Sequence, residues 1–126
     1  MSNHTAVTAS QLPPQAGPYS HGIVANGFLY TAGFGPQDRH GTVVGDSVGD
    51  QTRQVMRNIL ATLDAHGLTA ADIVKTTVHL QHLTRDFAEF NDAYQEFLTE
   101  PFPVRTTVGS QLMNILVEID VVATAE

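Results

Sequence analysis

The sequence predicts an α+β domain with a single sheet and two helices on one face of that sheet. Two patterns predict this class. In two segments the apolar residues recur every three or four positions, which indicates helices. Segments with the two-residue alternation of strands lie before, between and after these two helical segments. The resulting order, β-β-α-β-α-β-β, is typical of one sheet covered by its helices. We expect one domain over residues 1–126, the usual length of a single domain.

The chain begins with a polar arm and a hairpin. Residues 1–15 are polar and include two consecutive prolines, and we expect this arm to be loose. Residues 20–25 and 28–33 are β-prone, and the Asn26-Gly27 pair between them is a strong signal for a tight turn. The glycine-rich stretch over 35–45 predicts a loop.

The first helix and the next strand follow this loop. Apolar residues recur at helical spacing over 46–66, with Asp46 or Ser47 as the expected N-cap and Gly67 as the expected left-handed C-cap. Residues 73–80 alternate, so even-numbered and odd-numbered side chains should face opposite sides of a half-covered strand.

The second helix and two final strands complete the sheet. An aromatic and apolar stripe predicts a helix over 85–98, with Thr84 as its N-cap and two prolines after its end. Strands are expected over 104–110 and 115–123. In the last strand the odd-numbered residues share one apolar face, and Glu118 is among the residues on the other face.

Charge and composition exclude several classes of function. Six Lys and Arg against thirteen Asp and Glu give a net charge of -7, so we expect no nucleic-acid partner. No apolar run approaches the ~18 residues of a membrane span, and no signal peptide is visible, so we expect a cytoplasmic protein. The absence of cysteine excludes disulfides and thiol catalysis. The six histidines show no recognised ligand spacing, so no metal site is predicted.

The sheet face away from the helices should be half apolar. Charged residues form only 15% of the chain, against about 25% in a typical domain. An exposed, half-apolar sheet face on such a chain indicates that copies of it associate, and we expect a closed cyclic assembly.

Arg105, Glu118 and Tyr19 are the residues that could carry chemistry. An isolated guanidinium in an apolar strand needs an anion, which is either Glu118 in a structural pair or the carboxylate of an incoming ligand. Glu118 could instead act as a general acid or base or position a water. Tyr19 follows a Gly-Pro turn that can hold its phenol in place, either to pack the loop or to donate a hydrogen bond.

Several segments together resemble the reactive-intermediate deaminase family, also called the Rid or YjgF family. They run in family order from about Gly17 to Ala123. The segments are Gly17-Pro18-Tyr19-Ser20-His21, Ala25-Asn26-Gly27-Phe28-Leu29-Tyr30 with Gly33, Gln51-Thr52-Arg53-Gln54-Val55 with Asn58-Ile59, Asp72-Ile73-Val74-Lys75-Thr76-Thr77-Val78, Asp86-Phe87-Ala88 with Asn91 and Tyr94, Phe102-Pro103-Val104-Arg105, and Leu116-Val117-Glu118-Ile119.

This resemblance implies a fold, an assembly and an activity. It implies a chorismate-mutase-like fold (bacillus type) and a homotrimer with three clefts between subunits. The implied activity is hydrolysis of reactive enamines and imines, such as 2-iminopropanoate and 2-iminobutanoate, to 2-keto acids and ammonia. The implied partner is a small molecule with a carboxylate, and no cofactor is implied.

The resemblance also assigns roles to individual residues. Arg105 matches the arginine that clamps the substrate carboxylate, Tyr19 matches the tyrosine that lines the cleft, and Glu118 matches the glutamate that orients water. Thr107 occupies the small polar position two residues after the arginine. The further substrate-binding positions that we expect are Ala32, Gly33, Phe34 and Phe87.

Three departures from the family pattern indicate a divergent member. Ala32-Gly33-Phe34 stands where the family reads Ser-Gly-Gln, the 109–114 loop is about two residues shorter and lacks the usual Leu-Pro, and Gly109 replaces a larger polar residue. These changes favour a bulkier or more apolar substrate. Two alternatives remain open: a relative that acts on a bulkier imine, enamine or keto acid in a specialised pathway, and a non-catalytic trimer that binds a small ligand.

Overall fold

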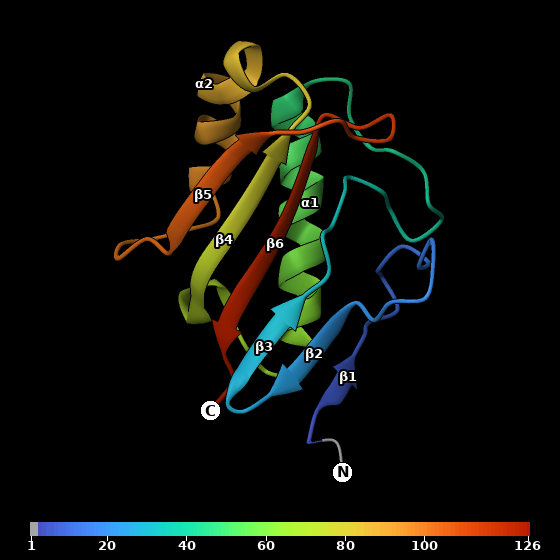
Figure 1. Cartoon of the computed structure of the whole chain (residues 1–126), viewed down its shortest axis with the longest axis vertical. Coiled ribbons are helices and arrows are strands. Elements are labelled where there is room, and N and C mark those ends of the chain that lie inside the picture. Colours follow the sequence, from blue (N-terminus) through green and yellow to red (C-terminus); the bar gives the residue numbers. More distant parts are fainter. Residues whose placement is uncertain (1–2) are drawn as a thin grey trace.

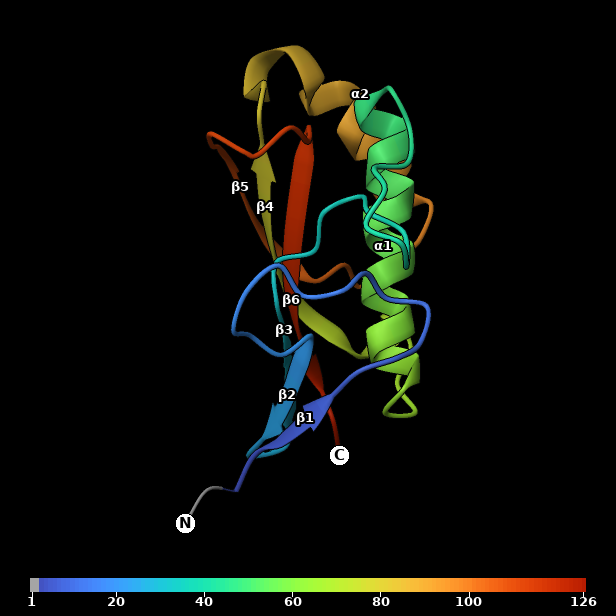
Figure 2. The same cartoon turned by 90° about the vertical axis from the view of Figure 1, so that its right-hand side faces the viewer.

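The computed structural model describes residues 3–126 as one mixed sheet of six strands with both long helices on the same face (Figures 1 and 2). The strand order is β1-β2-β3-β6-β4-β5, in which β4 and β5 are parallel and the other neighbours are antiparallel. The elements are β1 (Thr5–Val7), β2 (Gly22–Ala25), β3 (Phe28–Thr31), α1 (Val48–Asp64), a short 3-10 helix η1 (Ala70–Asp72), β4 (Ile73–Leu80), α2 (Leu83–Gln95), β5 (Val104–Gly109) and β6 (Val117–Thr124). The predicted α+β class with two helices on one face is confirmed.

The predicted hairpin joins β2 to β3. Asn26 and Gly27 both have positive φ, 52° and 80°, which is the conformation that a two-residue hairpin turn requires. The register pairs Ala25 with Phe28 directly across this turn.

The N-terminal arm is not loose throughout, contrary to expectation. Thr5–Val7 adds a sixth strand at the edge beside β2, and both Val7 and Leu12 are buried in the core. Two apolar side chains at these positions bury surface that a loose arm would leave in water. Residues 1 and 2 of the predicted arm lie outside the described residues.

Helix α1 begins one residue after its N-cap. The Ser47 hydroxyl accepts a hydrogen bond from the backbone N–H of Asp50, so Ser47 is the N-cap and Asp46 is not. Gly67 has the predicted left-handed conformation, with a φ of 73°, but it is not the C-cap: the helix ends at Asp64, and Ala65 is its C-cap.

Two local predictions in the second half are wrong. A β-bulge between Ile73 and Lys75 shifts the register, so Ile73 is buried on the helix side while Val74 is 41% exposed. Helix α2 begins at Leu83, with His82 as its N-cap and no side-chain capping bond, so Thr84 lies inside the helix. The chain turns into this helix directly after β4, and the bond from Asp86 N–H to the His82 carbonyl closes the first turn.

The core lies between the sheet and the helices. The odd-numbered side chains at 117–123 of β6 are fully or almost fully buried there, as the alternation predicts. The opposite face of the sheet has no helix over it in Figure 2. Among residues 3–126, no helix combines the length and apolar character that crossing a bilayer requires.

Candidate functional site

Arg105 lies near the start of the edge strand β5, with its side chain against α2. Its backbone is in register with Thr76, which is buried on the helix side of β4. The guanidinium carbon lies 5.7, 5.4 and 5.0 Å from the ring centres of Phe87, Phe90 and Tyr94 respectively. Three rings at this distance hold a cation by its attraction to their faces and also orient its planar fork.

The Arg105 guanidinium pairs with no carboxylate among the described residues. Across residues 3–126 the structure gives it neither a hydrogen bond nor an ion pair. The pairing with Glu118 that the sequence left open is therefore absent. A cation held by aromatic rings and left without an anion is suited to binding a carboxylate from outside.

A groove of about 400 Å³ adjoins this guanidinium. It is lined by Asn91, Tyr94, Gln95, Phe102, Pro103 and Arg105. The Tyr94 hydroxyl is engaged in a buried hydrogen bond of 2.8 Å to the Thr76 hydroxyl. Burial raises the pKa of Tyr94 above its ordinary value, so its hydroxyl stays protonated around neutral pH. Thr107 is half-buried on the same face as Arg105 and stands opposite Val78 in the register.

A second group of predicted residues meets around Gly33. A Cβ added at Gly33 would lie only 2.7 Å from the Glu118 Oε2 atom, so the Glu118 carboxylate rests directly on this glycine. Phe34 follows, buried, with two backbone hydrogen bonds to Ile119 of β6. Ala32 is half-buried and donates its backbone N–H to the His21 carbonyl.

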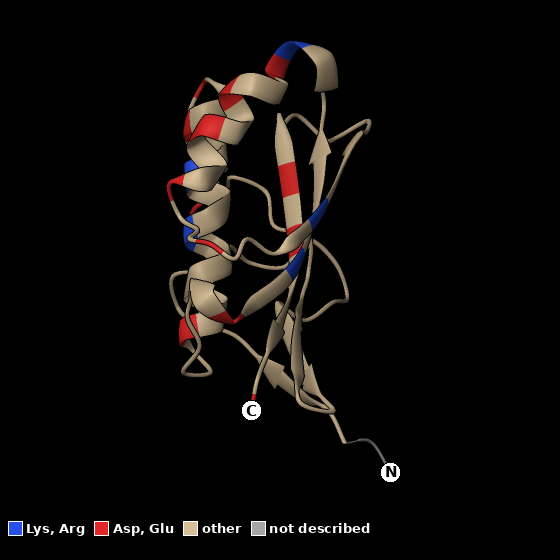
Figure 3. Ribbon diagram, turned by 90° about the vertical axis from the view of Figure 1, so that its left-hand side faces the viewer, with Lys and Arg blue, Asp and Glu red and all other residues tan. Residues whose placement is uncertain are grey.

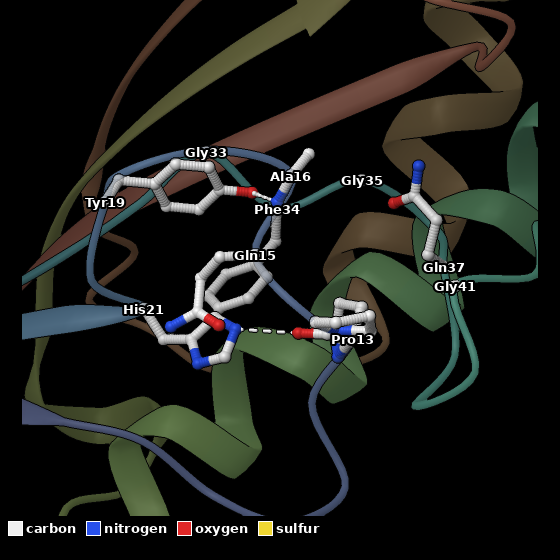
Figure 4. Close-up of a pocket in the computed structure, with 11 residues that line it drawn as sticks. Pro13, Gln15, Ala16, Tyr19, His21, Gly33, Phe34, Gly35, Gln37 and Gly41 are labelled. Carbon is white, nitrogen blue, oxygen red and sulfur yellow. Dashed lines mark hydrogen bonds between the residues drawn. The ribbon is translucent and has the colours of Figure 1, made fainter.

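Gly33 and Tyr19 also line a cavity of about 320 Å³ (Figure 4). The lining residues are Pro13, Pro14, Gln15, Ala16, Tyr19, His21, Gly33, Phe34, Gly35, Gln37 and Gly41. The Tyr19 phenol oxygen accepts a hydrogen bond of 3.1 Å from the Ala16 N–H, which fixes the phenol within its turn although the side chain is 48% exposed. None of these lining residues is Asp, Glu, Lys or Arg, so the cavity suits a group without charge.

His21 forms part of this cavity's wall and has both ring nitrogens engaged. Nδ1 is 2.7 Å from the Thr8 hydroxyl and Nε2 is 2.8 Å from the Pro13 carbonyl, and the ring stacks on Phe34. Because a carbonyl only accepts, Nε2 carries a proton, and the Thr8 hydroxyl can then donate to Nδ1 of a neutral ring. His21 therefore ties the N-terminal arm to the sheet.

The open sheet face beside Glu118 carries a second acid. Asp120 is half-buried there, and burial raises its pKa, while the nearby charges of His79 and Lys75 act in the opposite direction with smaller effect. His79 is the direct cross-strand partner of Glu118, and its Nδ1 lies 2.7 Å from the Ser110 hydroxyl.

The predicted site residues thus form two separate groups. Arg105, Thr107 and Phe87 lie on the helix side of the sheet edge. In the other group Tyr19, Gly33 and Phe34 line the cavity, and Glu118 lies against Gly33 outside the cavity lining. One chain does not bring the groups together, because Glu118 shares a face with Asp120, opposite to the helices.

Three residues of the Arg105 group were not predicted from the sequence. Phe90 and Tyr94 belong to the aromatic stripe that predicted the second helix, and both rings also face Arg105. Their helical spacing from Phe87, which places all three on one side of α2, was the signal that could have identified them. Asn91, on the same helix, was likewise not predicted as a site residue.

Comparison with known proteins identifies the family. The sequence profile described as endoribonuclease L-PSP matches residues 9–125. The chain belongs to this family, which is the Rid or YjgF family. A Rid protein of Salmonella typhimurium named 2-iminobutanoate/2-iminopropanoate deaminase is 35% identical over 122 residues, which cover 93% of this chain and 94% of that protein.

Solved structures of Rid proteins have the same fold. The Escherichia coli YjgF gene product superposes with a TM-score of 0.88 at 34% identity, over 97% of this chain and 99% of that chain. Escherichia coli TdcF with bound serine superposes with a TM-score of 0.89 at 30% identity, over 97% of this chain and 99% of that chain. The expected Rid membership and chorismate-mutase-like fold are therefore confirmed.

Proposed function

We propose that this Rid protein hydrolyses 2-imino acids such as 2-iminopropanoate and 2-iminobutanoate to 2-keto acids and ammonia. The observation that carries the proposal is the Arg105 guanidinium, which three aromatic rings hold beside an open groove and which has no anion among the described residues. The Salmonella relative named as a deaminase of these two imines supports the choice of substrate. The serine bound to TdcF supports a small ligand with a carboxylate.

The chemistry requires few groups. Arg105 binds the substrate carboxylate with two parallel hydrogen bonds and thereby fixes the imine carbon. Glu118 accepts a proton from a water whose oxygen bonds to that carbon, while the C=N electron pair moves to nitrogen and receives this proton from Glu118. The carbinolamine then collapses: Glu118 moves the hydroxyl proton to the amino nitrogen, the C–O bond becomes C=O, the C–N bond breaks, and ammonia and a 2-keto acid leave. Tyr19 donates its phenol O–H to the water or to the carboxylate.

The site forms between two copies in this proposal. Arg105 and Glu118 point to opposite sides of one sheet, so Arg105 of one copy faces Tyr19 and Glu118 of the next. The open sheet face supports self-association because Phe28, Tyr30 and Val104 all expose apolar surface there. We propose a homotrimer, for which light scattering would give three times the chain mass; a monomer would contradict it.

The family description also names an endoribonuclease, which the charges do not favour. The net charge is -7, and Figure 3 shows the Lys and Arg residues scattered over helices and strands and not gathered in one patch. Binding to a phosphate backbone depends on clustered cations. A small carboxylate needs a single arginine.

The test is release of ammonia or keto acid from freshly generated 2-iminopropanoate and 2-iminobutanoate. Wild type should accelerate hydrolysis, and Arg105→Ala should not. Arg57→Ala is the matched control, because Arg57 is exposed on α1 and bonds only to Gln54 among the described residues. No acceleration by wild type, or equal activity in Arg105→Ala, would contradict the proposal.

The second candidate function is hydrolysis of imino acids with a larger side chain. The cavity of about 320 Å³ beside Gly33 has no charged residue in its lining, and the buried Phe34 is one of the lining residues. This volume exceeds what a methyl or ethyl group occupies, and it favours a bulkier apolar side chain. Imines generated from leucine and phenylalanine should then be hydrolysed with a higher kcat/KM than 2-iminopropanoate, and the reverse order would exclude this candidate.

A further inference from the structure

Asn91 lies on the side of α2 that carries the Arg105 rings. Phe87 precedes it by four residues and Tyr94 follows it by three, and both rings contact the Arg105 guanidinium. Residues at these spacings are neighbours on one helix surface. Asn91 accordingly lines the same groove as Arg105.

The Asn91 side chain contains an acceptor without a partner. Its Oδ1 atom is buried and receives no hydrogen bond from the described residues. Buried side-chain oxygens are nearly always bonded, so an unbonded one beside a groove indicates a missing donor. A donor that enters the groove would remove the cost of leaving this oxygen unpaired.

The other polar side chains of the groove are engaged or exposed. The Tyr94 hydroxyl is bonded to Thr76, and Gln95 is exposed to solvent. Phe102 and Pro103 add apolar surface. The groove therefore offers a ligand one fixed cation and one unpaired acceptor, and the complementary ligand has a carboxylate with an N–H group close to it.

We infer that Asn91 accepts a hydrogen bond from the nitrogen of the bound substrate and so selects α-imino and α-amino acids over acids that lack nitrogen. The inference rests on the proposed function, because it takes Arg105 as the carboxylate clamp. Because Oδ1 is buried, the inference includes a rotation of the Asn91 amide about its last bond that turns Oδ1 towards the groove when the ligand binds. A bond from the imine N–H to Asn91 fixes the plane of the C=N group and stabilises the protonated imine, which is the form that water attacks most readily.

The test compares two ligands that differ only in the amino group, L-2-aminobutanoate and butanoate, by isothermal titration. Asn91→Ala should weaken 2-aminobutanoate binding by about 10-fold or more and change butanoate binding by less than about 2-fold. Arg105→Ala should weaken both acids. Asp92→Ala is the control, because Asp92 is the next residue of α2, is exposed and does not line the groove.

Thermal unfolding distinguishes this role from a structural one. Removing an acceptor that has no partner should leave Tm unchanged or higher in Asn91→Ala and in the isosteric Asn91→Leu. A fall in Tm with equal weakening of both acids, or no change for either acid, overturns the inference. If Asn91→Ala weakens only 2-aminobutanoate binding but the wild type hydrolyses no imine, the deaminase proposal fails and the inference about Asn91 stands. If Arg105→Ala abolishes imine hydrolysis but Asn91→Ala affects both acids equally, the deaminase proposal stands and the inference about Asn91 fails.

Discussion

Arg105 and Glu118 lie on opposite faces of one sheet, on strands that β4 separates. Arg105 is in register with Thr76, whose hydroxyl bonds to Tyr94 of α2, and Glu118 is in register with His79 on the face without helices. The sheet itself, with β4 between the two strands, prevents a contact within a chain. Any reaction that uses both side chains must therefore take place between copies.

Complementation between inactive variants follows from this arrangement. Arg105→Ala and Glu118→Ala should each be inactive alone, but unfolding and refolding them together should restore about a quarter of wild-type activity, because random pairing leaves that share of sites with both groups intact. Activity is measured as keto-acid release. A mixture no more active than the single variants would mean that the two residues do not serve one site.

Gly33→Ala should displace the Glu118 carboxylate. The new Cβ would lie 2.7 Å from Oε2, and the carboxylate must move by several tenths of an ångström or more. Misplacing a group that orients water should lower kcat by about 10- to 100-fold while Tm changes little. In a Glu118→Ala background the same change should have no further effect, since its target is absent. An additive loss in that background would contradict this account.

Thr76→Val should destabilise the fold through Tyr94. The Thr76–Tyr94 hydrogen bond is 2.8 Å long and both residues are buried, so the substitution leaves the phenol without a partner. We expect a loss of about 1–3 kcal/mol in the free energy of unfolding, measured by chemical denaturation. The double variant Thr76→Val with Tyr94→Phe should regain part of this stability, because no polar group is then left unpaired.

Asp120→Asn should stabilise the protein at neutral pH. Burial raises the Asp120 pKa in the folded state, so folding penalises the charged carboxylate. As the pH falls through the raised pKa, the carboxylate is protonated in the folded state and the wild type becomes more stable relative to the variant. The difference in stability between the two proteins should disappear near the ordinary aspartate pKa of about 3.9. The measurement is the difference in unfolding free energy between pH 7 and pH 4. A wild type that is more stable than Asp120→Asn at pH 7 would show that a cation pairs with Asp120 in the assembled protein.

Most of the fold was predictable because its signals are local. The Asn26-Gly27 turn and the alternation over 117–123 depend on adjacent residues, and both were confirmed. The bulge at Ile73 was not predictable, since it depends on how β4 pairs with β6. The strand at Thr5–Val7 was missed because it has only three residues and forms only by pairing with β2, which the local sequence does not show.

The candidate site was predicted as a list of residues but not as an arrangement. Alternation correctly placed Arg105 and Thr107 on one face and Glu118 on the non-core face of its own strand. Alternation within a strand could not show how the faces of β5 and β6 relate, because each of these strands pairs with β4 and they do not pair with each other. The unbonded oxygen of Asn91 also required the structure, because a sequence does not show which polar groups lack partners.

The two ends of the described chain emerge at the same end of the sheet (Figure 1). Thr5–Val7 is held beside β2, and the Ala125 N–H donates to the Gly27 carbonyl at the neighbouring hairpin turn, so both ends are anchored. A flexible Gly/Ser linker can therefore join one copy to the next in a single polypeptide. Such a tandem protein would allow one copy at a time to be altered, so that the number of working clefts could be set by genetic design instead of by chance mixing.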